Sequence, residues 1–116
     1  MFGTTCGALF SNDRSLQVQL EESGQKTGQR LWNLPLWEDW EDEIKSDVAN
    51  FKNISLKPVG DCIVAATFLK HFINDHPKWA HLDIAGTAFG DTEFVPSRAG
   101  TAFGIRLLID FIEGVL

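Results

Sequence analysis

The chain has 116 residues, 44% of them hydrophobic and including nine Phe and four Trp, so we expect one folded domain over residues 1–116 and exclude a disordered chain. Ten basic residues against sixteen acidic ones give a net charge of −6, which argues against nucleic acid and anionic membranes as partners because phosphate binding needs clustered Lys and Arg. No apolar run approaches the roughly 20 residues of a membrane span, and two cysteines without a signal-peptide pattern at the amino terminus predict a reduced, cytoplasmic protein.

The first predicted elements are a strand and a helix. Residues 4–10 form a short, largely apolar run that polar residues end, which is typical of a strand. Asn12 or Asp13 then caps a helix, because either side chain can accept a hydrogen bond from the first turn. Gly24 or Gly28 is expected to end this helix.

A tryptophan-rich stretch follows. The sequence LWNLPLW at residues 31–37 is expected to be irregular, because Pro35 blocks a helix through it. Trp37, Trp40 and Ile44 fall at positions i, i+3 and i+7, which predicts a short amphipathic helix. The acidic run EDWEDE around Trp40 is interpreted as its solvated face.

The second half of the chain predicts two helices and a strand. Residues 61–73 read as a strongly apolar helix after a loop, and WAHLDIA at residues 79–85 is the best strand candidate. Alternation along this strand places two sets of side chains on opposite faces, namely Ala80, Leu82 and Ile84 on one and Trp79, His81, Asp83 and Ala85 on the other. The final helix carries Leu107, Leu108, Phe111, Ile112 and Val115.

Strands interleaved with helices predict an α/β fold. Only two strands stand out in the sequence, and a lone two-stranded sheet is marginally stable. We therefore expect a sheet that is incomplete as a stand-alone unit.

Three stretches carry a family resemblance: GQRLWNLPLWEDWEDEIKSDVANFKNI, AATFLKHFINDHPKWAHLDIAGTAF and GIRLLIDFI. In this order and spacing they resemble the carboxyl-terminal part of the leucyl aminopeptidase (cytosol aminopeptidase) family. The resemblance covers nearly the whole chain from Gly3 onward, and HPKWAHLDIAG is its most specific part.

This resemblance implies a cytoplasmic metallo-aminopeptidase, a hydrolase that removes amino-terminal residues from peptides. It implies two divalent metals, zinc, manganese or magnesium, which hold a bridging water as nucleophile and polarise the scissile carbonyl. It also implies a three-layer domain, with helices around a mixed sheet, and a homo-oligomer, typically a hexamer.

The chain departs from the family in one respect. The family's metal ligands and its catalytic Lys and Arg lie in earlier segments, including one that reads Asn-Thr-Asp-Ala-Glu-Gly-Arg, and this sequence contains no such stretch. We therefore expect the last third of a catalytic domain, with no catalytic or metal-binding residue of its own and no activity in isolation. The alternative is a non-catalytic interaction module that keeps the family's assembly surface.

The resemblance also suggests substrate-binding residues. The positions that match Ala85 and Ala88 line the pocket for the first side chain of the substrate, where small residues leave room for Leu or Met. The position that matches Ile54 borders the pocket for the second, with Cys62 close to it. The 85–88 stretch also follows the strand candidate, and ligands of open α/β sheets bind beyond the carboxyl ends of strands.

The histidines of the chain admit both chemical and structural roles. His71, His76 and His81 are five residues apart, which does not place metal ligands on one helix face, so a private metal site with Asp75 or Asp83 is disfavoured. His81 and Asp83 share a strand face and could form a base with its orienting carboxylate, but a structural contact is favoured because no nucleophile accompanies them.

Cys62 and the tryptophans also admit two readings. Cys62 opens a predicted helix whose dipole could lower its pKa, yet no His partner is evident and a structural role is favoured. Trp32, Trp37 and Trp40 could hold a ligand cation, although core or subunit packing is favoured.

The pentapeptide GTAFG occurs twice, at residues 86–90 and 100–104. Their spacing is shorter than the usual repeat units, so the two copies are interpreted as coincident. The first belongs to the pocket wall. In the second, Thr101 is expected to cap the last helix, Phe103 to pack in the core and Gly104 to allow a close approach.

Overall fold

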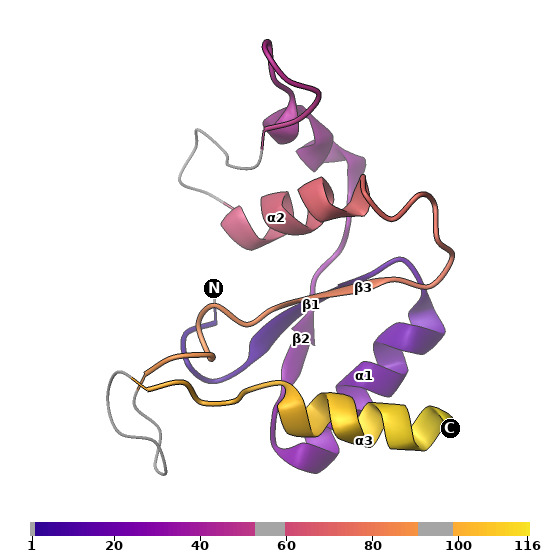
Figure 1. The fold of residues 1–116 in the computed structure, drawn as a ribbon, viewed down its shortest axis with the longest axis vertical. Coiled ribbons are helices and arrows are strands. Elements are labelled where there is room, and N and C mark those ends of the chain that lie inside the picture. The colour runs from indigo at the N-terminus through magenta and orange to yellow at the C-terminus, as the bar shows by residue number, and fades with distance from the viewer. Residues whose placement is uncertain (1, 53–59, 91–98) are drawn as a thin grey trace.

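A computed structural model of the chain describes residues 2–52, 60–90 and 99–116 (Figure 1). Its strands are β1 (Gly7–Ser11), β2 (Leu31–Asn33) and β3 (Ala80–Asp83). Its helices are α1 (Arg14–Thr27), the 3₁₀ helix η1 (Glu38–Ile44), α2 (Asp61–Lys70) and α3 (Ile105–Val115). The strand order is β2-β1-β3, with β1 parallel to β2 and antiparallel to β3, so the fold is α/β with a mixed sheet, as predicted.

Helices cover both faces of this sheet. On one face, Leu9 of β1 packs with Leu20 of α1 and Leu107 of α3. On the other face, Phe10 of β1 packs with Ala66 of α2. Because consecutive residues of β1 point to opposite faces, both must be apolar, which explains the continuous run GALF. The result is the expected three-layer arrangement, with α2 on one side and α1 and α3 on the other (Figure 1).

The two ends of α1 follow local signals. The Asp13 side chain accepts a hydrogen bond from the Leu16 amide at 2.7 Å, which identifies it as the cap in preference to Asn12. Gly28 ends the helix in the left-handed conformation, and Gly24 lies inside it.

The prediction of an irregular stretch at residues 31–37 is wrong at its start, where β2 pairs with β1. The Leu34 amide also donates to the Leu9 carbonyl at 2.8 Å. A strand of three residues is too short to show alternation, so only its tertiary pairing with β1 defines it. Within the described residues, β2 and β3 are the two edges of a three-stranded sheet.

Three further elements differ from expectation. The amphipathic helix at Trp40 is a 3₁₀ helix, and α2 ends at Lys70 where residues up to 73 were expected. After Lys70 the amides bond to the carbonyl three residues back in place of four, and Asn74 and Asp75 then have positive φ, which no α-helix allows. β3 is shorter than WAHLDIA, with its side chains on the expected faces. No helix in the described ranges is both long and apolar enough to cross a membrane.

Candidate functional site

A tight turn follows β3 and contains the first two pocket candidates. The Asp83 carboxylate accepts a hydrogen bond from the Ala85 amide at 3.0 Å. The Ile84 carbonyl then accepts from the amides of Thr87 at 2.9 Å and Ala88 at 2.8 Å. Thr87 is buried, Ala85 is exposed and Ala88 is partly buried. These bonds hold Ala85 and Ala88 in one defined turn.

The two GTAFG pentapeptides lie against each other. The Thr101 amide donates to the Ala88 carbonyl at 2.9 Å, and Phe89 forms an antiparallel bridge with Gly100. The Thr101 hydroxyl also donates to the Thr87 carbonyl. The second pentapeptide therefore supports the backbone of the first, a contact that the sequence comparison of the two copies missed.

The expected helix cap at Thr101 is wrong. Gly104 is the cap residue of α3, and the first-turn amides of Gly104 and Leu107 both donate to the Gln29 side-chain oxygen, at 3.2 and 3.0 Å. Gln29 is buried and comes from the segment just after α1. Gly104 has a φ of 95° and open space around its missing Cβ, so its role is the positive φ and not a close approach. Phe103 packs against the core as predicted.

The space beside this turn is small. Gly86, Asp83 and Gly3 help to line a cavity of about 10 Å³, roughly enough for one water. A substrate pocket at Ala85 and Ala88 therefore needs walls beyond those described here. The third candidate, Ile54, lies outside the described residues.

The direction of β3 removes one argument for this site. β3 runs antiparallel to β1, with Asp83 opposite Ala8. The carboxyl end of β3 therefore lies beside the amino ends of β1 and β2, on the opposite side of the sheet from their carboxyl ends. The rule for ligands beyond strand ends concerns parallel strands, so the assignment of Ala85 and Ala88 rests on the family resemblance alone.

His81 and Asp83 point to the α2 side of the sheet without forming a catalytic pair. The Asp83 carboxylate bonds to the turn, while the His81 ring stacks on Phe10 and Trp79, with centroids 6.0 and 6.4 Å apart. Burial lowers the pKa of His81, and the nearby Asp83 charge partly opposes this. A neutral, stacked imidazole fits the favoured structural role.

Cys62 lies in the first turn of α2 and is buried against β1. Burial raises the pKa of its thiol, and the negative charge of Asp83 raises it further. Hydrogen bonds from the amides at the start of α2 lower this pKa by less, so the expected net lowering is not found and Cys62 is a poor nucleophile at neutral pH.

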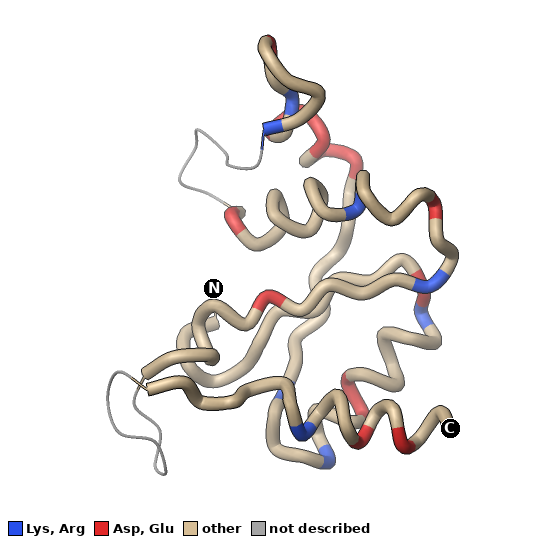
Figure 2. Tube along the Cα trace, viewed as in Figure 1, with Lys and Arg blue, Asp and Glu red and all other residues tan. Residues whose placement is uncertain are grey.

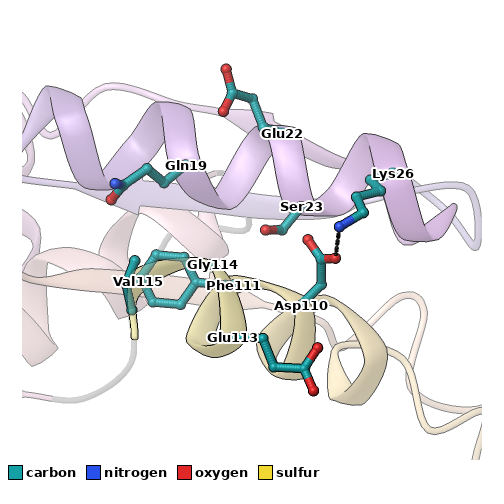
Figure 3. Close-up of a pocket in the computed structure, with 9 residues that line it drawn as sticks. All are labelled: Gln19, Glu22, Ser23, Lys26, Asp110, Phe111, Glu113, Gly114 and Val115. Carbon is teal, nitrogen blue, oxygen red and sulfur yellow. Dashed lines mark ion pairs between the residues drawn. The ribbon is translucent and has the colours of Figure 1, made fainter.

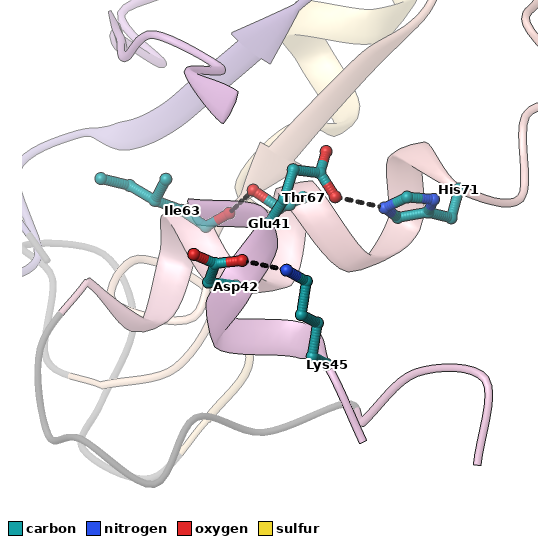
Figure 4. A network of polar contacts seen from close by, with 6 residues as sticks. All are labelled: Glu41, Asp42, Lys45, Ile63, Thr67 and His71. Carbon is teal, nitrogen blue, oxygen red and sulfur yellow. Dashed lines mark hydrogen bonds and ion pairs between the residues drawn. The ribbon is translucent and has the colours of Figure 1, made fainter. Parts of the chain in front are cut away.

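The other two histidines have separate partners. His71 Nε2 lies 2.6 Å from the Glu41 carboxylate, which joins α2 to η1 (Figure 4). His76 Nδ1 contacts the Lys78 backbone. Glu41 was assigned to a solvated face, and its contact with a residue thirty positions away has no local sequence signal. Within the described ranges, no three His, Cys, Asp or Glu side chains are grouped closely enough to hold a metal ion.

The three tryptophans considered as cation binders divide into one packed and two exposed side chains. Trp40 lies against Gly60, where a Cβ would come 2.6 Å from its ring. Trp32 and Trp37 are each 63% exposed. The packing interpretation therefore holds for Trp40 within this chain.

The sequence analysis also missed a cleft between α1 and α3. It has a volume of about 480 Å³ and contains the ion pair between Lys26 and Asp110 (Figure 3). Glu22 and Glu113 also line this cleft, but neither Ala85 nor Ala88 does. It is therefore separate from the suggested substrate pocket.

Comparison with known proteins gives the family. The family model described as "Cytosol aminopeptidase family, catalytic domain" matches residues 1–109. The "Probable cytosol aminopeptidase" of Chlorobaculum tepidum is 44% identical over 112 residues, which are 97% of this chain and 22% of that protein. The "Probable cytosol aminopeptidase" of Syntrophotalea carbinolica is 46% identical over 113 residues, which are 96% of this chain and 22% of that protein.

Solved structures agree with this assignment. The bottromycin maturation enzyme BotP superposes with a TM-score of 0.89 at 36% identity, covering 98% of this chain and 26% of BotP. The cytosol aminopeptidase of Coxiella burnetii superposes with a TM-score of 0.81 at 36% identity, covering 97% of this chain and 24% of that protein. The chain thus spans about a quarter or less of the proteins it matches. By sequence and by fold, it belongs to the cytosol aminopeptidase family, within the region that forms the catalytic domain.

Proposed function

We propose that this chain is the carboxyl-terminal segment of an aminopeptidase catalytic domain, which works together with the rest of that domain. The observation that carries the proposal is the family match over residues 1–109, combined with coverage of only 22% of the relatives' length. In this role, the segment supplies scaffold and the wall of the substrate pocket through Ala85, Ala88 and Ile54. Peptides with free amino termini are the proposed substrates, and the cytoplasm is the proposed location.

The metal ions of the proposed enzyme are held by the remainder of the domain. A solved BotP structure is a complex with Mn, which supports a divalent metal for this part of the family. The described residues do not fit such a site, because no three potential ligands are grouped together. In this proposal, no side chain of this chain takes part in a chemical step.

The small turn residues suggest a specificity. Ala85 is exposed beyond β3, and Ala88 is held by the hydrogen bond from Thr101 to its carbonyl. A methyl group at each position takes up little room, so in this proposal the remaining walls of a pocket for an apolar substrate side chain come from the rest of the domain. This arrangement supports a preference for amino-terminal Leu or Met.

A second candidate is a non-catalytic module that binds another protein. The exposed apolar side chains of α3 favour it, because soluble proteins tend to cover such faces. The binding module differs from the first candidate in one outcome: adding the rest of the catalytic domain would not generate peptidase activity.

Complementation tests the proposed function. The chain would be coexpressed with the Chlorobaculum tepidum relative from which the matching region has been deleted. With Mn²⁺, we expect hydrolysis of leucyl amides by the pair and by neither part alone. The control is a coexpressed chain carrying Leu107→Asp, which disrupts the core of the segment. A pair that copurifies but remains inactive would favour the binding module.

A further inference from the structure

Helix α3 is apolar on two sides. Leu107 is fully buried and Phe111 packs beside it against the sheet. The opposite side carries four apolar side chains that are 41–56% exposed, namely Ile105, Leu108, Ile109 and Ile112, and Val115, 52% exposed, stands at its border with the cleft between α1 and α3. We call this second side the outer face of α3. An amphipathic surface helix of a monomer has one apolar stripe, so the outer face needs a partner.

The spacing on this face is that of a helix–helix seam. Ile105, Ile109 and Ile112 stand at i, i+4 and i+7, and the exposed Leu116 continues the pattern at i+11. These are the a and d positions of a heptad pattern, which pack between paired helices. The seam therefore fits another helix better than it fits a flat surface or a small ligand.

The two flanks of the seam differ in chemistry. Leu108 and Val115, one heptad apart, form an apolar flank. Arg106 and Glu113, also one heptad apart, form a charged flank with opposite signs at its two ends. Both charged residues are exposed, and Glu113 stands at the edge of the cleft with its carboxylate directed away from α1 (Figure 3). On the side facing α1, Lys26 is bonded to Asp110 in the cleft between the helices, which Glu22 also lines.

This pattern is complementary to itself in one orientation. When two identical helices pair antiparallel about a twofold axis, each flank faces the same flank of its partner. Arg106 then meets the partner's Glu113, and the symmetry repeats this ion pair. Leu108 meets the partner's Val115, and Ile109 lies opposite the partner's Ile112. In a parallel pair, the charged flank would face the apolar one.

We propose that the outer face of α3 binds the same face of a second copy of this chain, with the two helices antiparallel. Helices of this length bury less than a standard interface of about 1,600 Å², so this contact alone gives a weak, concentration-dependent dimer. The inference does not depend on the proposed peptidase function, because it concerns self-association without metal or substrate.

Charge reversal tests the orientation and the partner together. Arg106→Glu and Glu113→Arg each place like charges together twice per dimer, so each should raise the dissociation constant about tenfold. The double variant restores both ion pairs with reversed polarity, so its dissociation constant should be close to that of the unchanged chain. Sedimentation equilibrium of the 116-residue chain, across a wide concentration range, measures these constants.

Two further variants separate pairing from folding and net charge. Ile109→Asp places a charge in the seam and should abolish the dimer while circular dichroism remains unchanged. Arg14→Glu changes charge at an exposed position of α1 and should leave the dimer intact. The proposal is overturned if the chain stays monomeric, or if the double variant dimerises as weakly as the two single variants. The second result would indicate that α3 binds a different surface, such as the rest of the catalytic domain.

Discussion

At the scale of single residues, the described hydrogen bonds give buried polar side chains structural roles. Gln29 is the clearest example, because its side-chain oxygen accepts from two first-turn amides of α3 and its side-chain nitrogen donates to the Ala102 carbonyl at 3.4 Å. The helix thus begins on a cap supplied by a residue far away in sequence. A remote cap also joins the end of α1 to the start of α3, so it couples two elements that cover the same face of the sheet.

Replacing this cap should be costly. Gln29→Ala leaves two amides without their acceptor in a buried position, which should lower the free energy of unfolding by about 1–3 kcal/mol. The exposed Gln25→Ala is the matched control and should change stability by less than about 0.5 kcal/mol. Urea denaturation followed by circular dichroism measures both. Equal effects of the two variants would mean that the cap contributes nothing.

The pKa of His81 predicts a pH dependence. Burial holds this pKa below its ordinary value of 6.5, so the unfolded chain binds the proton more readily than the folded one. Stability from this group is therefore present above pH 6.5 and is lost as the pH falls through the folded pKa. In His81→Gln, urea midpoints should decline less over that range than in the parent. The exposed His76→Gln serves as control, and a decline identical to the parent's in His81→Gln would contradict the prediction.

At the scale of elements, the junction of η1 and α2 depends on a glycine. Gly60 has a φ of 68° and no room for a Cβ, because the Trp40 ring would be 2.6 Å away. Gly28, at the end of α1, has a similar φ of 74° but open space around it. A side chain at either position would be destabilised by the positive φ of the backbone. Only at Gly60 would it also clash with a neighbouring side chain.

Alanine substitutions at both glycines should separate these costs. Gly28→Ala should lose about 1–2 kcal/mol of stability, from the left-handed conformation alone. Gly60→Ala should lose about 1–3 kcal/mol more, because Trp40 must move. Combining Gly60→Ala with Trp40→Leu should recover most of that difference in urea denaturation. If the two single variants were equally destabilised, Trp40 would not pack on Gly60 in solution.

The elements also show what sequence patterns can predict. β1, β3 and the three α-helices are long enough to leave a local sequence pattern, either a continuous apolar run or a periodic one, and the cap at Asp13 follows a local rule. β2 exists only through its pairing with β1, and the Glu41–His71 contact joins separate elements. Such contacts depend on the tertiary fold, which a local pattern does not contain. The pocket candidates came from family resemblance, since Ala85 and Ala88 have no chemistry that a pattern could identify.

At the scale of the whole molecule, the chain has three layers but a narrow sheet. Its middle strand β1 is fully enclosed, whereas β2 and β3 form edges within the described residues. Acidic residues cluster along η1 and toward the end of α3 (Figure 2). Unpaired strand edges favour association with further strands. This arrangement supports a segment that completes its structure with other parts of a larger enzyme.

The last prediction concerns Ala88 within such a complete enzyme, assembled by the complementation described above. The Ala88 side chain is partly buried, and its backbone is held on both sides by Ile84 and Thr101. If this turn lines the pocket for the first substrate side chain, Ala88→Leu fills space that a substrate Leu needs. A change of a methylene or so in a pocket shifts discrimination by roughly 10–200-fold.

We therefore expect Ala88→Leu to reduce kcat/KM for Leu and Met amides at least about tenfold more than for Ala amides, with metal content unchanged. Exposed Phe89→Leu in the same turn is the control, since it removes an aromatic ring without adding bulk at position 88. A purely structural role for Ala88 predicts a different pattern, because overpacking lowers stability and reduces all substrates alike. Measuring the three amides on one preparation distinguishes the two. An unchanged ratio of Leu to Ala turnover, with lower thermal stability, would place Ala88 outside the pocket and leave the proposed peptidase function of the segment intact.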